Sequence, residues 1–135
     1  MTETLHDLGA LSTWSADADD LWLVTAVIQP FKLDAVTLAL EAIPACKGAT
    51  LTDCRGFGSE KLSRDRERSP VGGVVDYTKK LRLDCAVASH SDAIAVARAI
   101  AVAAHTGREG DGKVLISPIA GAVGIRTFSL DNAAF

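Results

Sequence analysis

The chain has 135 residues, which is enough for one domain with a buried core and too few for two. Hydrophobic residues make up 48% of the sequence but aromatic residues only 5%, so we expect a core of Ala, Val, Ile and Leu, as in helices packed on a sheet. The formal net charge of -3 gives no general attraction for nucleic acid or anionic lipid, so any anion site has to be local.

Residues 1–20 are polar and acidic, contain no Lys or Arg, and predict a flexible extension rather than a signal peptide. The folded domain is expected to occupy residues 21–135. No apolar run reaches the ~18 residues that a membrane span needs, and we expect a cytoplasmic protein. The three cysteines lack the spacing of a disulfide framework or a zinc site, and we interpret them as small buried hydrophobic residues rather than a redox group: Cys46, Cys54 and Cys85.

The first predicted elements are a strand, a helix and a second strand. Residues 21–28 form a nearly continuous apolar run, typical of a strand buried on both faces, and Pro30 ends it. Apolar residues at helical spacing then predict a helix, which Pro44 stops: Leu33, Val36, Leu40 and Ile43. Residues 49–55 predict the second strand, which ends in the glycine-bearing segment 56–58.

The second half of the chain repeats this order after a long connection. Residues 59–69 are dense in charge without apolar spacing and predict an exposed loop. Alternation over residues 81–88 predicts a third strand. A helix is expected over residues 92–105, capped by Ser89 or Ser91. Because this helix is rich in alanine and carries one charge at its middle, we expect it to pack on most sides.

A glycine-rich turn at 106–113 leads to a short strand at 114–116, which Pro118 ends, and a last short strand is predicted at 124–128. The order β-α-β, long loop, β-α-β is the ferredoxin-like pattern of an α+β sandwich. This pattern predicts an antiparallel sheet with both helices on one face. Since such apolar strands would leave an exposed patch on the other face, we expect a homo-oligomer.

The strongest local chemical signal is the turn at 107–113, whose sequence GREGDGK has the GxxxxGK spacing of a P-loop. A P-loop NTPase is not expected, because Val114 offers no hydroxyl for Mg²⁺ and because the turn leads from a helix to a strand. Glycines can still orient backbone N–H groups toward an anion, with Arg108 and Lys113 adding positive charge. An ordinary solvated turn is the alternative.

Five blocks in order carry a resemblance to a known family: residues 29–34, 56–58, 75–77, 106–113 and 125–127. From Trp22 to Thr127 the chain resembles the P-II signal transduction proteins. This resemblance implies a trimer that binds ATP or ADP in clefts between its subunits. It also implies that the long connection is a mobile T-loop through which a target protein is recognised.

The resemblance implies the nucleotide-binding residues one by one. The glycine turn would be the family's B-loop and would cradle phosphates through Gly110, Asp111, Gly112 and Lys113, with Arg108 nearby. Arg126 would reach the phosphates from the adjacent subunit. The adenine and ribose side would be lined by Val27, Thr50, Gly56, Gly58, Lys80, Asp84 and Ala86. For Val27 and Thr50, plain packing in the sheet is an equal alternative.

The departures from the family concern mainly the T-loop. Where well-characterised members have a glutamine that helps to bind Mg²⁺ with ATP and 2-oxoglutarate, this chain has Glu60, so 2-oxoglutarate sensing is not expected and a role of Mg²⁺ stays open. Ser59 and Gly124 replace two arginines that face the phosphates. Each such charge-assisted contact contributes about 1.5–3 kcal/mol, so we predict that ADP or AMP binds at least as tightly as ATP. No tyrosine occurs between Gly58 and Val75, which excludes uridylylation of this loop.

A divergent loop with the nucleotide turn retained is similar to a carboxysome-associated branch of P-II-like proteins that is thought to respond to bicarbonate. The resemblance makes bicarbonate a candidate second effector here. Backbone N–H groups around Gly58 and Ser59, next to Glu60, would hold this planar anion together with Lys61.

We predict a regulatory binding module without a cofactor and not an enzyme, because Glu60, Glu109 and Asp111 form no evident catalytic constellation. A slow nucleotide hydrolase and a CutA-like metal-binding trimer on the same fold are the alternatives, although no metal ligands are predicted. An RNA-recognition module would need exposed aromatic residues on its central strands, which this pattern lacks. The expected partners are further copies of the chain, an adenine nucleotide and an unknown target protein, a membrane transporter included, but no nucleic acid and no membrane span.

Overall fold

The computed structural model describes residues 21–57 and 77–126. The predicted extension at 1–20, the predicted T-loop between Gly58 and Asp76, and residues 127–135 lie outside this part of the chain. The predicted effector residues Gly58, Ser59, Glu60 and Lys61 therefore lie outside it as well.

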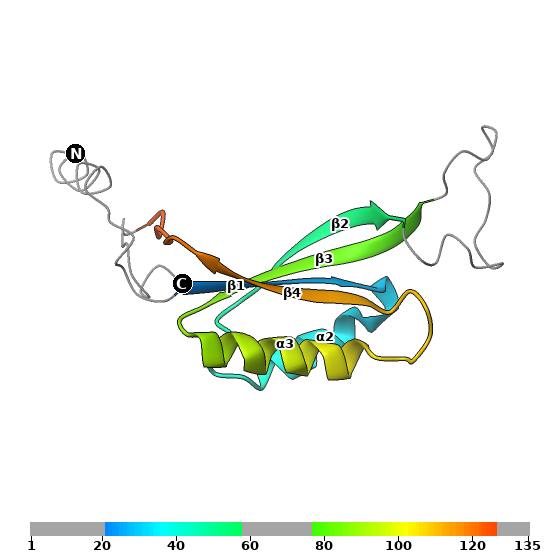
Figure 1. Ribbon diagram of the computed structural model, residues 1–135, viewed down its shortest axis with the longest axis horizontal. Helices are drawn as coiled ribbons and strands as arrows, with labels where there is room; N and C mark the ends of the chain where they lie inside the picture. The colour runs from blue at the N-terminus through cyan, green and yellow to red at the C-terminus, as the bar shows by residue number, and fades with distance from the viewer. Residues whose placement is uncertain (1–20, 58–76, 127–135) are drawn as a thin grey trace, which may run out of the picture.

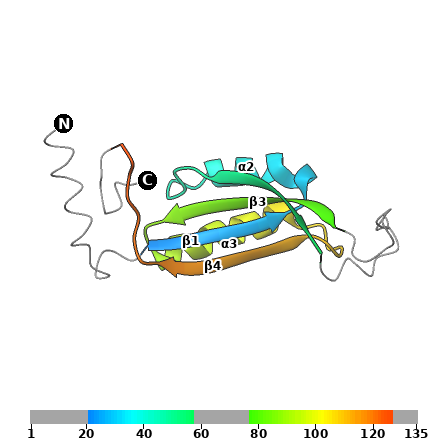
Figure 2. The same cartoon turned by 90° about the horizontal axis from the view of Figure 1, so that it is seen from above.

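The described residues form an antiparallel sheet with helices on one of its faces (Figure 1). The elements are β1 (Leu21–Ile28), η1 (Pro30–Lys32), α2 (Leu33–Glu41), β2 (Thr50–Gly56), β3 (Thr78–Val87), α3 (His90–Ala104) and β4 (Gly112–Ile119). The strand order is β2-β3-β1-β4, and every neighbouring pair is antiparallel. Figure 2 shows the four strands side by side with both helices beneath them. The predicted α+β, ferredoxin-like β-α-β-β-α-β fold is confirmed.

β1 is the central strand, since it pairs with β3 on one side and β4 on the other. Its alternate residues Val24, Ala26 and Ile28 are fully buried toward the helices, while Thr25 and Val27 on the other face are only partly buried. The prediction of a strand buried on both faces is therefore wrong for the single chain. The described residues cover one face of the sheet and leave the other face open.

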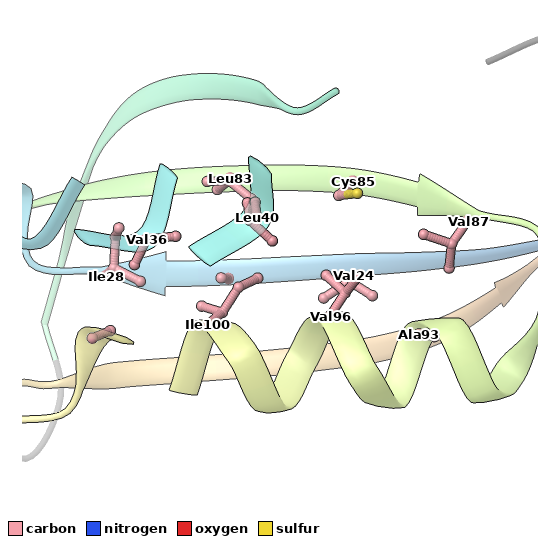
Figure 3. Packing of buried hydrophobic residues seen from close by; sticks show 12 residues of the cluster. Val24, Ile28, Val36, Leu40, Leu83, Cys85, Val87, Ala93, Val96 and Ile100 are labelled. Atoms are coloured by element: carbon pink, nitrogen blue, oxygen red, sulfur yellow. The ribbon is translucent and has the colours of Figure 1, made fainter. Parts of the chain in front are cut away.

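The core lies between the sheet and the two helices (Figure 3). Burial of each Val, Leu or Ile side chain contributes roughly 1.5–3 kcal/mol, so this layer carries most of the stability of the subunit. Figure 3 labels its main members, which come from β1, α2, β3 and α3: Val24, Ile28, Val36, Leu40, Leu83, Cys85, Val87, Ala93, Val96 and Ile100. Cys85 belongs to this core as predicted, whereas Cys46 and Cys54 are only partly buried.

α3 begins where a serine caps it. The Ser89 hydroxyl oxygen accepts a hydrogen bond of 3.1 Å from the Asp92 backbone N–H, so the first of the two predicted capping serines is the one used. The expectation that α3 packs on most sides is wrong. Val102 is 74% exposed, so only one face of this alanine-rich helix is buried.

β4 is longer than predicted, because Pro118 does not end it. This proline lies opposite Trp22 on an edge strand, where one side of the backbone needs no ladder partner. The predicted last strand is wrong for residues 124–126, which have no strand structure. Gly121 and Gly124 weaken an extended segment there, and β1 has already ended its pairing at Leu21. Residues 127–128 of this prediction lie outside the described part.

Within residues 21–57 and 77–126, no helix has both the length and the apolar character to cross a membrane.

Candidate functional site

The predicted B-loop is a tight turn that connects α3 to β4. Gly107, Gly110 and Gly112 have φ angles of 87°, 91° and 103°, in the left-handed region that glycine adopts most readily. At Gly112 there is a second requirement, because an added Cβ would lie 1.8 Å from the Val27 carbonyl oxygen. The chain can therefore enter β4 directly beside β1 only with a glycine at this position.

Asp111 holds the turn together from within. Its carboxylate accepts hydrogen bonds from the Thr106 backbone N–H at 2.7 Å, from the Gly107 N–H at 2.9 Å and from the Thr106 hydroxyl. The Gln29 side-chain amide also donates to it at 3.0 Å and so ties the turn to the end of β1. His105 Nδ1 lies 3.8 Å from the carboxylate.

These contacts change the acidity of Asp111. The hydrogen bond from the Thr106 hydroxyl, followed by those from the Thr106 and Gly107 backbone N–H groups, lowers the pKa of this carboxyl to about 2 from its ordinary value of 3.8. Asp111 is therefore ionised throughout the physiological range. Since both its oxygens accept hydrogen bonds from the protein, the carboxylate holds the turn in position.

Lys80 links the same turn to β3. Its ammonium donates a 2.6 Å hydrogen bond to the Gly110 carbonyl, and the residue is only 6% exposed. A buried ammonium is costly unless it is hydrogen-bonded, so this contact fixes the middle of the turn. Arg108 and Lys113, by contrast, are exposed on the turn.

A groove of about 520 Å³ lies between α3 and β4, beside the turn. Arg98 and His105 line it from the helix side, and Asp111 and Lys113 line it from the turn. Its remaining lining is largely apolar. The apolar wall and the Arg98 side chain can accept an organic anion, whereas Lys113, opposite Val27, directs its side chain toward the open face of the sheet.

A second group of predicted residues lines a separate pocket of about 390 Å³, where Thr50, Asp84 and Ala86 meet the connection between α2 and β2. Thr50 lies opposite Asp84 in the β2–β3 ladder. The Asp84 carboxylate accepts a 2.6 Å hydrogen bond from the Thr25 hydroxyl and forms a 3.1 Å ion pair with Arg82. Arg82 thus compensates the negative charge of Asp84 on the open face of the sheet.

Within one chain the structure brings only part of the predicted site together. Val27 lies opposite Lys113, and Lys80 reaches the turn. Asp84 is four residues from Lys80 along β3, which corresponds to roughly 13 Å. The second pocket is therefore distinct from the turn.

Two further predicted residues lie at the ends of strands. Gly56 lies opposite Thr78 at the end of β2, next to the undescribed connection. Arg126 belongs to the segment that follows β4, and this segment leaves the sheet at the end opposite to the turn, since β4 begins beside Ile28 and ends beside Leu21 (Figure 1). Arg126 therefore cannot serve the turn of its own chain without a large movement.

Sequence reasoning missed two residues at the turn and one residue of the adjoining groove. Gln29 and Thr106 were recognised only as parts of family blocks, and Arg98 only as an isolated charge. The usable signal was the position of Gln29 directly after a central strand, because the residues that follow such a strand lie next to the start of its antiparallel neighbour.

Among the described residues there is no group of three or more His, Cys, Asp or Glu side chains that could hold a metal ion.

Comparison with known proteins places this geometry in context. Residues 21–129 match the family model described as nitrogen regulatory protein P-II. The chain is 42% identical over 112 residues to the nitrogen regulatory protein P-II of Rhizobium etli. This alignment covers 83% of this chain and 97% of that relative. It is 37% identical over 116 residues to the nitrogen regulatory protein GlnK of Escherichia coli strain K12, with the same coverage of 83% and 97%. A crystal structure of Arabidopsis thaliana PII bound to citrate has a TM-score of 0.68 and 26% identity, covering 90% of this chain and 100% of that one.

The matching family model and relatives define the class of this molecule, a regulatory protein of the P-II type. The chain belongs to the P-II family. The resemblance inferred from the five sequence blocks is confirmed, and the regulatory character of the family agrees with the expectation that the chain is not an enzyme. Its assignment to the carboxysome-associated branch stays a prediction.

Proposed function

We propose that the chain is a P-II-like signalling subunit that binds an adenine nucleotide in clefts between the subunits of a homotrimer, with the phosphates at the 107–113 turn. The observation that carries this proposal is the rigid construction of the turn. Three left-handed glycines, the Asp111 carboxylate and the Lys80 ammonium hold its backbone in one conformation before any ligand arrives. A site built in advance loses little conformational freedom on binding.

The charges around the turn favour a phosphate ligand. Arg108 and Lys113 are exposed on it, and Arg98 lines the same groove as Lys113. Each charge-assisted hydrogen bond to a phosphate would contribute about 1.5–3 kcal/mol. The ionised Asp111 carboxylate and the exposed Glu109 oppose part of this attraction.

The open face of the sheet and the position of Arg126 support a homotrimer. The open face carries apolar residues that the described chain leaves uncovered, among them Leu115, which is 53% exposed. Arg126 lies too far from its own turn to contact a phosphate there. A neighbouring copy packed on the open face would supply Arg126 and the Thr50–Asp84 pocket to a shared cleft, which unites the two groups of predicted residues.

The nucleotide preference follows from the sequence. With Ser59 and Gly124 in place of two cationic side chains, ADP or AMP would bind at least as tightly as ATP. Bicarbonate would be the second effector, and residues 58–76 would transmit the bound state to a target protein as the T-loop. We propose this transmission as ligand-dependent selection of one loop state that the partner recognises.

Calorimetric titration of the purified trimer with AMP, ADP and ATP, each with and without Mg²⁺ and bicarbonate, tests the proposal. The expected result is saturable binding of ADP or AMP at least as tight as that of ATP, with an affinity that changes when bicarbonate is added. A strong preference for ATP with Mg²⁺ would contradict the proposed nucleotide order. Affinities that stay constant across a bicarbonate titration would remove bicarbonate as an effector.

A further inference from the structure

Two of the three cysteines are in direct contact although they are far apart in the sequence. Cys46 Sγ and Cys85 Sγ are 3.3 Å apart and come from positions 39 residues apart. Cys85 lies in β3 and belongs to the core, and Cys46 lies in the connection between α2 and β2. Both cysteines are free thiols, and their sulfur atoms contact each other.

The two thiols differ in exposure and therefore in chemistry. Cys85 is 1% exposed, whereas Cys46 is only partly buried. Burial, followed by the hydrogen bond with Cys46, raises the pKa of the Cys85 thiol to about 12 from its ordinary value of 9.0. A dissolved oxidant would thus reach Cys46 first, while Cys85 remains a protonated thiol behind it.

We propose that Cys46 and Cys85 form a reversible dithiol–disulfide site in which a hydroperoxide oxidises Cys46 and Cys85 closes the bond. The Cys46 thiolate attacks one peroxide oxygen, the O–O bond breaks, and the sulfur becomes a sulfenic acid. The hydroxide released takes up the proton that Cys46 had lost and leaves as water.

The Cys85 proton then passes to the sulfenic oxygen as the Cys85 sulfur attacks the Cys46 sulfur. The S–O bond breaks, and the oxygen leaves as a second water molecule. Two thiols have then lost two protons and two electrons, and one hydrogen peroxide has become two waters. A dithiol reductant reverses the change by attack on the disulfide through a mixed-disulfide intermediate.

The geometry requires little movement. A disulfide has a sulfur–sulfur distance of about 2.05 Å, so the two sulfurs need to approach by about 1.2 Å from their present contact. The connection that carries Cys46 is irregular between residues 42 and 49, and its Cys46 backbone N–H donates to the Ile43 carbonyl at 3.0 Å. An irregular segment at the surface can take up such a shift more easily than β3.

The bond would fix a wall of the second pocket. Lys47, Gly48 and Ala49 follow Cys46 directly and line the pocket that contains Thr50 and Asp84. Oxidation would therefore restrain the connection next to residues assigned to the nucleotide. This consequence rests on the proposed function, but formation of the bond does not.

Cys54 provides a matched control. It lies opposite Lys80 in the β2–β3 ladder, so its side chain is on the open face, whereas Cys85 faces the helices. Replacement of Cys54 by serine removes one thiol without touching the pair.

The test is oxidation of the reduced full chain with hydrogen peroxide, followed by alkylation of free thiols and peptide mapping by mass spectrometry without reduction. The expected result is a peptide in which Cys46 is joined to Cys85 of the same chain, both in the natural protein and in Cys54→Ser, and its loss after treatment with dithiothreitol. In Cys85→Ala, a dimedone adduct should accumulate on Cys46, because no second thiol resolves the sulfenic acid.

A second measurement keeps the proposal open to refutation if Cys85→Ala fails to fold. Hydrogen exchange of residues 42–49 should slow by several-fold on oxidation of the natural protein and remain unchanged in Cys46→Ser. The proposal is overturned if Cys46 is oxidised to a sulfinic acid without joining Cys85, if the bond involves Cys54 or links two chains, or if neither thiol reacts.

Discussion

Asp111 is the residue on which the conformation of the 107–113 turn depends. Donors from Thr106, Gly107 and Gln29 converge on one carboxylate, and they join the end of α3, the turn and the end of β1. Such convergence depends on the charge of the acceptor, because hydrogen bonds to an ionised group are about twice as strong as those between neutral groups. The side chain therefore fixes the conformation of the turn.

Replacement of Asp111 by asparagine tests this role through its pH dependence. The pKa of Asp111 is lowered from 3.8 to about 2 in the folded protein, so its contribution to stability is present above about pH 4 and is lost as the pH falls through about 2. In acid unfolding followed by circular dichroism, the natural protein should lose its advantage over Asp111→Asn across this window. Asp53→Asn, at an exposed carboxylate on β2, is the control. A constant difference between the natural protein and Asp111→Asn at all pH values would contradict the assignment.

Gly112 is the second residue on which the turn depends. An alanine Cβ there would lie 1.8 Å from the Val27 carbonyl oxygen and would also force a side chain into the left-handed region. We expect Gly112→Ala to destabilise the protein by about 2–4 kcal/mol, from overpacking together with backbone strain, as measured by urea unfolding. Gly48→Ala meets no atom within 4 Å and should change stability by less than about 0.5 kcal/mol. Equal effects of the two substitutions would show that the β1–β4 contact is looser than described.

At the scale of the elements, the sequence predicted correctly those features that neighbouring residues determine on their own. The strand β1, the helix α2, the capped start of α3 and the glycine turn all follow from hydrophobic spacing, a serine cap and positive-φ glycines. The length of β4 does not, because a proline is tolerated only if the strand lies at an edge, and being at an edge is a property of the whole sheet. The exposed side of α3 was not predicted either, because the covered side of a helix also depends on the whole fold.

The candidate site also has a part that the sequence predicts and a part that it does not. The glycines and the exposed cations of the turn could be predicted from residue type and order. The contacts of Gln29 with Asp111 and of Lys80 with Gly110 join positions 82 and 30 residues apart, and no pattern within a segment indicates such pairs. The contact between Cys46 and Cys85 was not predicted for the same reason, because these residues are 39 positions apart in the sequence.

The cap of α3 gives a test at the level of the element. Ser89→Ala should cost about 1 kcal/mol of stability, because it removes the acceptor for the Asp92 backbone N–H at the start of the helix. Ser91 lies inside α3 and is exposed, so Ser91→Ala should have little effect or stabilise slightly. Urea unfolding of the two variants under the same conditions distinguishes them. A larger loss for Ser91→Ala would mean that the helix begins elsewhere.

At the scale of the whole molecule, the open face of the sheet and the remote position of Arg126 agree with the trimeric assembly of the P-II family. A single chain has its apolar layer on one side of the sheet and its mixed polar and apolar face exposed on the other. Under the proposal, burial of that face between copies would remove the patch and bring the two ends of the sheet into the same site. The subunit thus has a stable core of its own, but its proposed ligand site is complete only in the assembly.

Leu115→Asp tests this arrangement. Leu115 is on β4 opposite Thr25 and faces away from the helices, so a carboxylate there would be buried without a partner in the assembly. We expect sedimentation analysis to show a trimer for the natural protein and predominantly monomer for this variant. Val102→Asp places the same charge on the exposed side of α3 and should remain trimeric. A trimer that survives Leu115→Asp but not Val102→Asp would place the interface on the helices.

The most direct test of the central claim is a calorimetric comparison of ADP and adenosine, in the natural protein and in Lys113→Ala. If the turn binds the phosphates, ADP should bind at least ~10-fold more tightly than adenosine. Lys113→Ala should reduce this ratio of affinities by roughly 10-fold. Lys79→Ala, at an exposed cation of β3, should leave the ratio unchanged. Equal affinities of the natural protein for ADP and adenosine, or no binding of either, would contradict the account.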